Sequence, residues 1–260
     1  MKIFETHAHY DDESFNEDRD HLITEMLGAS GIIDSIVNIG ASLKGCKDSL
    51  ALAAKYDKVY AVIGIHPSDV EALTLNDIEW LGENAIKNPK AVAIGEIGLD
   101  YHYEKPSKDI QKKWFIEQIA LAKKVNKPIV VHSREACQDT ITIMKQEDAK
   151  SVGGIVHCYS YTKETAKDFL EMGFYFGIGG VITFKNAKKL VEAVEYIPMD
   201  KLLLETDSPY LAPEPNRGKR NDSTNIPFIA EKIAQIKGIS TAQVIDKTNE
   251  NARKVFHLIQ

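Results

Sequence analysis

Six residues of the types that bind metal ions each lie at or near the end of a short apolar run. They are four histidines, one glutamate and one aspartate: His7, His9, Glu96, His132, His157 and Asp207. Short runs of branched apolar residues are typical of strands that are buried on both faces. A polar side chain at the end of such a strand points toward whatever lies beyond it. The pattern therefore predicts that five strands deliver ligands to one metal centre, as in a metal-dependent hydrolase.

Most of these residues have an ordinary explanation when each is taken alone. His7 and His9 share one face of a strand, but a single His-x-His is a weak signal. His132 and His157 each close an apolar strand and could be core histidines. Asp207 precedes Ser-Pro and could cap a turn. All of them at the same end of one sheet favour a metal centre.

The number of candidate ligands predicts two ions. Four imidazoles and two carboxylates exceed what one tetrahedral catalytic site needs while it keeps a position for water. Glu96 lies on a middle strand, where its carboxylate could bridge two ions. We assign His7, His9 and Asp207 to one ion, and His132 and His157 to the other. The nitrogen-rich shell suits zinc, manganese or nickel better than magnesium, and magnesium, manganese and zinc are all kept as candidates.

Apolar runs that leave room for one helix each recur along the chain. The expected strands are Ile3–Thr6, Ile33–Ile39, Val59–Ile65, Ala91–Ile97, Ile129–His132, Gly154–His157, Phe174–Ile178 and Lys201–Thr206. The expected helices are Glu17–Ser30, Leu43–Lys55, Asn76–Lys87, Lys108–Val125, Glu135–Glu147, Lys163–Met172, Ala187–Tyr196 and Ile226–Lys237. In Lys108–Val125, residues at spacings of three and four, Gln118 among them, form an apolar stripe.

Eight alternations of strand and helix predict a (β/α)8 barrel of the TIM type. A last helix, Thr241–His257, is expected to pack on its outside. An open doubly wound sheet would gather its ligands at one switch point, whereas these are spread from the first strand to the last. Residues 1–260 contain no linker of low complexity, so we expect one domain.

Composition sets limits on compartment and partners. The 43% hydrophobic and 27% charged residues are ordinary for a globular protein. Three cysteines without Cys-x-x-Cys spacing indicate a reducing compartment. No signal peptide or membrane-spanning run is evident, so we expect a cytoplasmic monomer without an obligate protein partner. The net charge of −6 argues against a broad duplex-binding surface but allows a nucleic acid to enter a locally positive cleft.

Several motifs in order along nearly the whole chain resemble the TatD-type deoxyribonucleases of the amidohydrolase superfamily. They are Thr6–His9, Gly64–Pro67, Gly95–Tyr101, His132–Arg134, His157–Ser160, Gly180–Lys185, Glu205–Leu211 and Arg217–Asn221. The resemblance implies a metal-dependent phosphodiesterase, commonly a 3′-to-5′ exonuclease on DNA, and its metal ligands fall on the six residues chosen above. The chain departs from the family pattern at Ser223, where proline is usual, and at Tyr159, where phenylalanine is common.

The expected chemistry is hydrolysis of single-stranded DNA from its 3′ end. Two ions would supply a water of lowered pKa and neutralise the phosphoryl oxygens. We expect Asp207 to orient that water and act as general base beside its role as ligand, with Glu96 as the second catalytic residue. The candidate substrate-binding residues are His66, Arg134, Arg217 and Arg220. Their ordinary alternatives are packing under Pro67 for His66, a salt bridge for Arg134, and a solvated basic loop for the last two.

Residues next to the ligands carry further expectations. Glu5 shares a strand face with His7, and Glu205 shares one with Asp207, so both glutamates are expected to contact ligand imidazoles. An internal pair with a lysine is their alternative. Cys158 follows His157 and is expected to face away from the metals.

Two other functions are open on the sequence alone. The first is a binuclear amidohydrolase that cleaves a C–N or ester bond of a small molecule. Many such enzymes bridge their ions with a carbamylated lysine, but the fourth strand carries Glu96 and the next lysine is Lys105, beyond that strand. The second is a metal-binding protein without turnover, which a damaged ligand set would favour. All six candidate ligands are present.

Overall fold

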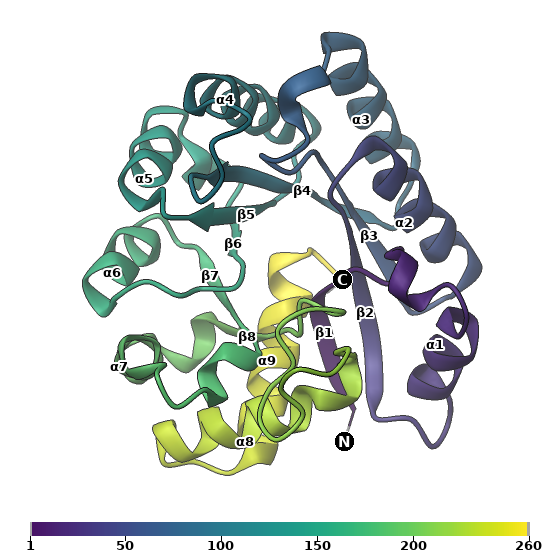
Figure 1. Cartoon of the computed structure of the whole chain (residues 1–260), viewed down its shortest axis with the longest axis vertical. Coiled ribbons are helices and arrows are strands. Elements are labelled where there is room, and N and C mark those ends of the chain that lie inside the picture. Colours follow the sequence, from purple (N-terminus) through teal and green to yellow (C-terminus); the bar gives the residue numbers. More distant parts are fainter. Residues whose placement is uncertain (1, 259–260) are drawn as a thin grey trace.

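Eight parallel strands form one sheet, in which each strand pairs with its neighbour in chain order. The computed structural model describes residues 2–258. The strands are β1 (Ile3–Ala8), β2 (Ile33–Gly40), β3 (Val59–Ile63), β4 (Ala91–Asp100), β5 (Ile129–Arg134), β6 (Gly154–Val156), β7 (Tyr175–Ile178) and β8 (Leu202–Leu204). The helices form a ring around the strands, except for the last one, which lies near the centre of the view in Figure 1. The predicted (β/α)8 barrel is confirmed.

The helices alternate with the strands as expected, and one more follows at the C-terminal side. They are α1 (Arg19–Leu27), α2 (Leu43–Lys55), α3 (Leu75–Lys87), α4 (Lys108–Val125), α5 (Cys137–Gln146), α6 (Lys163–Glu171), α7 (Lys188–Tyr196), α8 (Ile226–Lys237) and α9 (Thr241–Val255). Local signals set several boundaries. Thr74 begins α3 with a capping box that it shares with Asp77, and Ser240 begins α9 with one that it shares with Gln243.

The barrel closes where the segment after β8 meets β1. The Asp207 N–H donates to the His7 carbonyl at 2.9 Å, and the His9 N–H donates to the Ser208 carbonyl at 2.8 Å. Ala8 and Ser208 also form a parallel bridge. This seam therefore places His7 of β1 and His9 just after it directly beside Asp207, which lies at the far end of the chain.

A small apolar cluster fills the inside of the barrel. It contains residues of seven strands, including Phe4, Val62 and Leu203, together with Val255 and Phe256 from the end of α9. The Phe4 and Phe256 rings stack with their centroids 6.3 Å apart. Residues of so many strands can meet only in the interior of the barrel. The end of α9 packs against them there and closes the barrel at the amino ends of the strands. The expectation that this helix lies wholly outside is therefore wrong at its last turn, whose apolar residues gain more burial inside.

Boundaries differ from the expected ones where side chains replace ladder hydrogen bonds. β3 ends at Ile63 rather than Ile65, because the backbone of Ile65 is bound on both sides by the Gln118 side chain of α4. β4 runs three residues farther than expected, to Asp100. Within residues 2–258, none of the helices combines the length and apolar character that a membrane span needs.

Candidate metal centre

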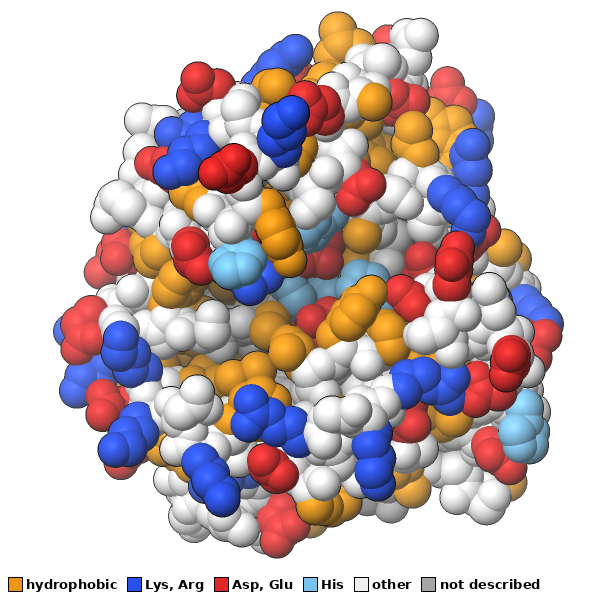
Figure 2. All heavy atoms as spheres, in the orientation of Figure 1, with side chains coloured by type: hydrophobic (Ala, Val, Ile, Leu, Met, Phe, Trp, Pro, Cys, Tyr) orange, Lys and Arg blue, Asp and Glu red, His pale blue; other side chains and the backbone are white. Residues whose placement is uncertain are grey.

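The structure brings the six predicted ligands together at the carboxyl ends of the strands. This end of the barrel carries a hollow whose centre shows histidine and acidic side chains (Figure 2). Two cavities of about 350 and 320 Å³ open there, and both are lined by His132, His157 and Asp207. The barrel ends are where active sites of this fold are built.

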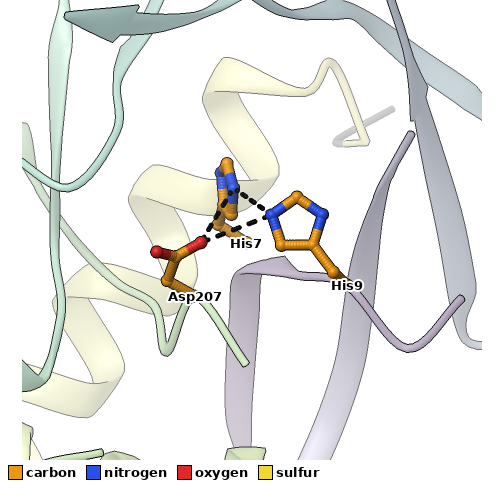
Figure 3. A group of neighbouring side chains, drawn as sticks. All are labelled: His7, His9 and Asp207. Atoms are coloured by element: carbon orange, nitrogen blue, oxygen red, sulfur yellow. Dashed lines mark hydrogen bonds and ion pairs between the residues drawn. The ribbon is translucent and has the colours of Figure 1, made fainter. Parts of the chain in front are cut away.

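One group of donor atoms forms at the barrel seam (Figure 3). His7 Nε2 and His9 Nε2 lie 3.3 Å apart. Asp207 Oδ1 lies 3.6 Å from His7 Nε2 and 3.3 Å from His9 Nε2. Asp207 adopts a left-handed backbone conformation with φ 59°, which aspartate tolerates better than most residues. Together with the N–H bond to His7, this turn directs the carboxylate toward the two imidazoles.

A second group of donor atoms forms between β4, β5 and the end of β6. Glu96 Oε1 lies 2.8 Å from both His132 Nδ1 and His157 Nε2. The two imidazole nitrogens lie 3.4 Å apart. Each set of three offers donor atoms within 4.8 Å of one another, close enough to surround one ion.

Glu96 connects the two groups through its two carboxylate oxygens. Oε2 faces the seam, 3.4 Å from His7 Nε2 and 3.9 Å from His9 Nε2, while Oε1 faces the other pair of histidines. The residue is buried, with 3% of its surface exposed. Burial would raise the pKa of Glu96, but the surrounding histidines outweigh it and hold that pKa well below its usual range.

Hydrogen bonds on the far nitrogens fix two of the imidazoles. His9 Nδ1 lies 3.0 Å from the Ile39 carbonyl, so it must donate its proton there. His132 Nε2 lies 3.2 Å from Asp100 Oδ2 and donates to it in the same way. Burial would lower the pKa of both imidazoles, but the nearby carboxylates outweigh it and raise the pKa of His9 to about 9 and that of His132 above its usual value. In the neutral form, His9 Nε2 and His132 Nδ1 carry lone pairs that face carboxylate oxygens and other imidazoles. A divalent metal ion can take the place of the extra protons, so the donor set fits such ions.

The two glutamates that were expected beside the imidazoles differ in their contacts. Glu205 Oε1 lies 3.6 Å from His157 Nδ1 and accepts a hydrogen bond from the Cys158 N–H at 2.6 Å. The expectation for Glu5 is wrong, because its carboxylate accepts hydrogen bonds from the His7 backbone N–H and from Thr206 instead. Glu5 lies at the seam, where its carboxylate binds the backbone N–H groups of His7 and Thr206.

Cys158 does not face away from the centre. It lines the same cavity as His157 and Asp207. The alternation of a strand does not extend to Cys158, because β6 ends at Val156 and Cys158 adopts a left-handed conformation with φ 45°. Burial raises the pKa of the Cys158 thiol, which keeps it protonated near neutral pH.

Two of the predicted substrate-binding residues lie at the edges of the centre. His66 lines the first cavity, and its Nε2 lies 3.9 Å from Glu96 Oε1. Burial lowers the pKa of His66 to about 4 against the opposing effect of Glu96, so its imidazole is neutral near pH 7. Arg134 is exposed, lines the second cavity and lies over the Tyr103 ring.

The other two arginines lie farther out, and neither lines the two cavities. The Arg217 guanidinium lies 4.3 Å from the centroid of the Phe184 ring. Arg220 pairs with Asp18 at 2.5 Å and donates to the Ser14 carbonyl. These contacts use three of the five N–H donors of Arg220, and its role in substrate binding stays a prediction.

Sequence reasoning missed several residues at the centre. Asp100 orients His132, and its signal was available, because it is four residues after Glu96 in the same strand and therefore on the same face. Asp11, Asp12 and Asp69 line the first cavity from three loop positions. They lie in the loops after β1 and β3, several positions beyond the strand ends, where strand alternation no longer predicts the direction of a side chain.

Comparisons with known proteins agree with this architecture. The family described as TatD related DNase matches residues 4–257. The chain is 43% identical to the uncharacterized metal-dependent hydrolase YabD of Bacillus subtilis, over 98% of this chain and 99% of that protein. It is 30% identical to the 3′-5′ ssDNA/RNA exonuclease TatD of Escherichia fergusonii, over 98% of each. The crystal structure of YJJV, a TatD homolog from Escherichia coli K12, superposes with a TM-score of 0.90 at 27% identity, covering 98% of both chains. The barrel, the motifs and the match over nearly the whole chain agree with one another. The protein therefore belongs to the TatD family of metal-dependent hydrolases.

Proposed function

We propose that this protein is a two-metal phosphodiesterase, a 3′-5′ exonuclease on single-stranded DNA, and that residues 1–260 act as one hydrolase domain. The observation that carries the proposal is the placement of Glu96, whose two oxygens face two separate groups of ligand atoms. Two ions a few ångströms apart are suited to phosphodiester hydrolysis, in which both the attacking and the leaving oxygen need stabilising. Magnesium, manganese and zinc are the candidate ions.

Bound metal ions would supply a water of lowered pKa and contacts that neutralise the phosphoryl oxygens. Asp207 would hold that water and accept its proton. Within the described chain, the ion pairs of Asp207 with His7 and His9 use Oδ1, which leaves Oδ2 for this role. The second role of Glu96 is to hold both groups of ligands at a constant separation.

Arg134 and His66 would bind the substrate on opposite sides of the ligands. Arg134 is exposed at the second cavity, where its planar guanidinium can form paired hydrogen bonds with a phosphate. The neutral His66 imidazole lines the first cavity and can donate one hydrogen bond there. Arg217 would meet the strand farther out, beside Phe184.

The choice of nucleic acid as substrate rests on the family and on the cleft. A relative with 30% identity carries the name 3′-5′ ssDNA/RNA exonuclease. A carbamylated lysine, which would favour small-molecule amidohydrolase chemistry, has no candidate here: among residues 2–258, no lysine lines either cavity. The molecule as a whole is acidic, so we expect a single strand to enter a local site rather than a duplex to wrap around the surface.

The test is hydrolysis of single-stranded DNA labelled at its 3′ or its 5′ end. The protein is stripped of metal and then supplied with Mn²⁺, Mg²⁺ or Zn²⁺. We expect metal-restored, stepwise shortening from the 3′ end, and a loss of about 100-fold or more in Glu96→Gln. Glu231→Gln, an exposed glutamate of α8, is the matched control and should retain full activity.

The opposite result is also informative. If no metal restores cleavage of DNA, although the purified protein binds two ions, the phosphodiesterase proposal fails. Hydrolysis of a C–N or ester bond in a small molecule would then be the chemistry to examine with the same metal-loaded protein.

A further inference from the structure

The two cavities are two lobes of one cleft that meet at the metal ligands. His132, His157 and Asp207 line both, so the lobes lie on either side of the reacting position. We name the first the acidic lobe, whose other lining residues include Asp11, Asp12, His66, Asp69 and Tyr210. We name the second the arginine lobe, whose other lining residues are Ser133, Arg134, Cys158, Ser160, Val181 and Leu211.

The charges of the lobes are opposite. Besides the candidate ligands Glu96 and Asp207, three aspartates line the acidic lobe, and within residues 2–258 neither lysine nor arginine lines it. The Asp69 carboxylate has no hydrogen bond or ion pair in the part of the chain that the structure describes, and partial burial raises its pKa. The arginine lobe has the opposite character, with one guanidinium beside hydroxyl groups and apolar side chains. A polyanion is therefore favoured in one lobe and repelled in the other.

A second arginine lies farther out on the side of the arginine lobe. Val181 lies in the short helical turn Gly180–Thr183, and Phe184 follows it directly. The Arg217 guanidinium covers the Phe184 ring, and the Thr183 hydroxyl accepts a hydrogen bond from the Glu214 N–H, which ties the two loops together. A DNA strand that leaves the arginine lobe past Val181 would next meet a second cation, the Arg217 guanidinium.

The acidic lobe has one feature that suits a nucleoside. The Tyr210 side chain is 53% exposed at its edge, and its hydroxyl donates to Asp12 at 3.0 Å, which fixes the ring in place. An exposed aromatic ring can stack on a base whatever the sequence. Carboxylates beside it can accept hydrogen bonds from the hydroxyl group of a sugar.

We propose that the acidic lobe receives the terminal nucleoside of the strand and the arginine lobe receives the phosphates that remain, so that the enzyme selects ends with a free 3′-hydroxyl over ends with a 3′-phosphate. This inference rests on the proposed exonuclease function. A 3′-phosphate would bring a charge of about −2 next to three carboxylates.

The products of each cleavage allow the same site to act again on the shortened strand. Water adds to the phosphorus, and the bond from phosphorus to the 3′ oxygen of the penultimate nucleoside breaks. That oxygen takes up a proton, and the terminal unit departs as a nucleoside 5′-phosphate. The shortened strand therefore ends in a 3′-hydroxyl again, which is the end that the acidic lobe accepts.

The experiment compares two otherwise identical 5′-labelled single strands, one with a 3′-hydroxyl and one with a 3′-phosphate. The rate constant for removal of the first nucleotide is measured for each with the Mn²⁺-loaded enzyme. We expect the hydroxyl end to react about 10-fold faster or more, as repulsion between close charges implies. In Asp69→Asn we expect the ratio of the two rates to fall by about 3- to 10-fold.

Asp57→Asn is the matched control, because it removes the same charge from an exposed position just before β3, at the other end of the barrel. Its ratio should equal that of the wild type. Equal rates on the two ends, or a ratio that Asp69→Asn does not change, would overturn the assignment of the lobes while leaving the exonuclease intact. Cleavage of neither strand with any metal would instead remove the proposed function, and this inference with it.

Discussion

At the scale of single residues, the orientation and donor strength of each ligand imidazole depend on the group that its second nitrogen contacts. His9 and His132 are fixed by the Ile39 carbonyl and by Asp100, whereas His7 Nδ1 and His157 Nδ1 have no hydrogen-bond partner among the described residues. A carboxylate behind a ligand histidine holds the ring and strengthens it as a donor. Asp100 should therefore affect metal binding although it is not one of the six ligands.

We predict that Asp100→Asn weakens metal binding by about 10- to 100-fold. The amide can still hydrogen-bond His132, but it lacks the charge that makes the imidazole a better donor. The measurement is titration of the metal-free protein with Mn²⁺ by calorimetry. Asp109→Asn, an exposed carboxylate in the first turn of α4, should leave the affinity unchanged. An Asp100 variant that binds metal as tightly as the wild type would show that orientation of His132 does not depend on this charge.

At the scale of elements, α4 holds two of the segments that carry the site. Gln111 and Gln118 are seven residues apart and buried on one face of this helix. Gln118 bonds to the N–H and the carbonyl of Ile65, just before His66. Gln111 does the same for Asp100. Each glutamine thus takes the place of a neighbouring strand where the sheet ladder stops.

We predict that Gln118→Leu lowers the free energy of unfolding by about 2–4 kcal/mol. Leucine fits the volume but leaves the N–H and the carbonyl of Ile65 buried without partners, each costing about 1–3 kcal/mol. Urea denaturation checks this. Gln138→Leu on α5 removes an exposed glutamine and should change the stability by less than about 0.5 kcal/mol. Equal stabilities of the two variants would mean that another group takes over the Ile65 backbone.

At the scale of the whole molecule, the proposed metal ions lie on the closure of the barrel. The ligands come from the first strand, the middle strands and the segment after the last one, and the seam between β1 and Asp207 holds few backbone bonds of its own. An ion shared by His7, His9 and Asp207 would join the two edges of the sheet. Bound metal should therefore stabilise the fold as well as support catalysis.

We predict that chelation lowers the Tm and that added metal restores it. Ligand in 100-fold excess over its Kd stabilises a protein by about 3 kcal/mol, which for a chain of this size is a shift of about 5–10 °C. Scanning calorimetry with EDTA and then with excess Mn²⁺ measures the shift. His7→Ala should reduce the response to metal, because one of the two ligand groups is then incomplete, whereas His21→Ala, an exposed histidine of α1, should keep the full response. A Tm that is independent of metal would show that the folded protein does not bind the ions in preference to the unfolded chain, contrary to the proposed centre.

The sequence by itself determined the barrel and the positions of the candidate ligands. Strand and helix periodicity follow from local chemistry, and parallel strands in a barrel all end at one face, so His132 or His157 can be assigned to that face without coordinates. The prediction that six residues bind two ions follows from the same logic and is still to be tested by metal analysis.

Only the tertiary structure decided which residues lie across the seam and between the lobes. The backbone bonds of Asp207 to His7, the ion pair that occupies Arg220 and the return of Phe256 into the barrel all join segments far apart in the chain. Gln118 is the clearest example, since its spacing indicates an apolar stripe but its amide binds the backbone before His66. Side-chain identity and spacing determine which face a residue occupies, whereas its partner depends on how distant segments pack, and local sequence does not encode that.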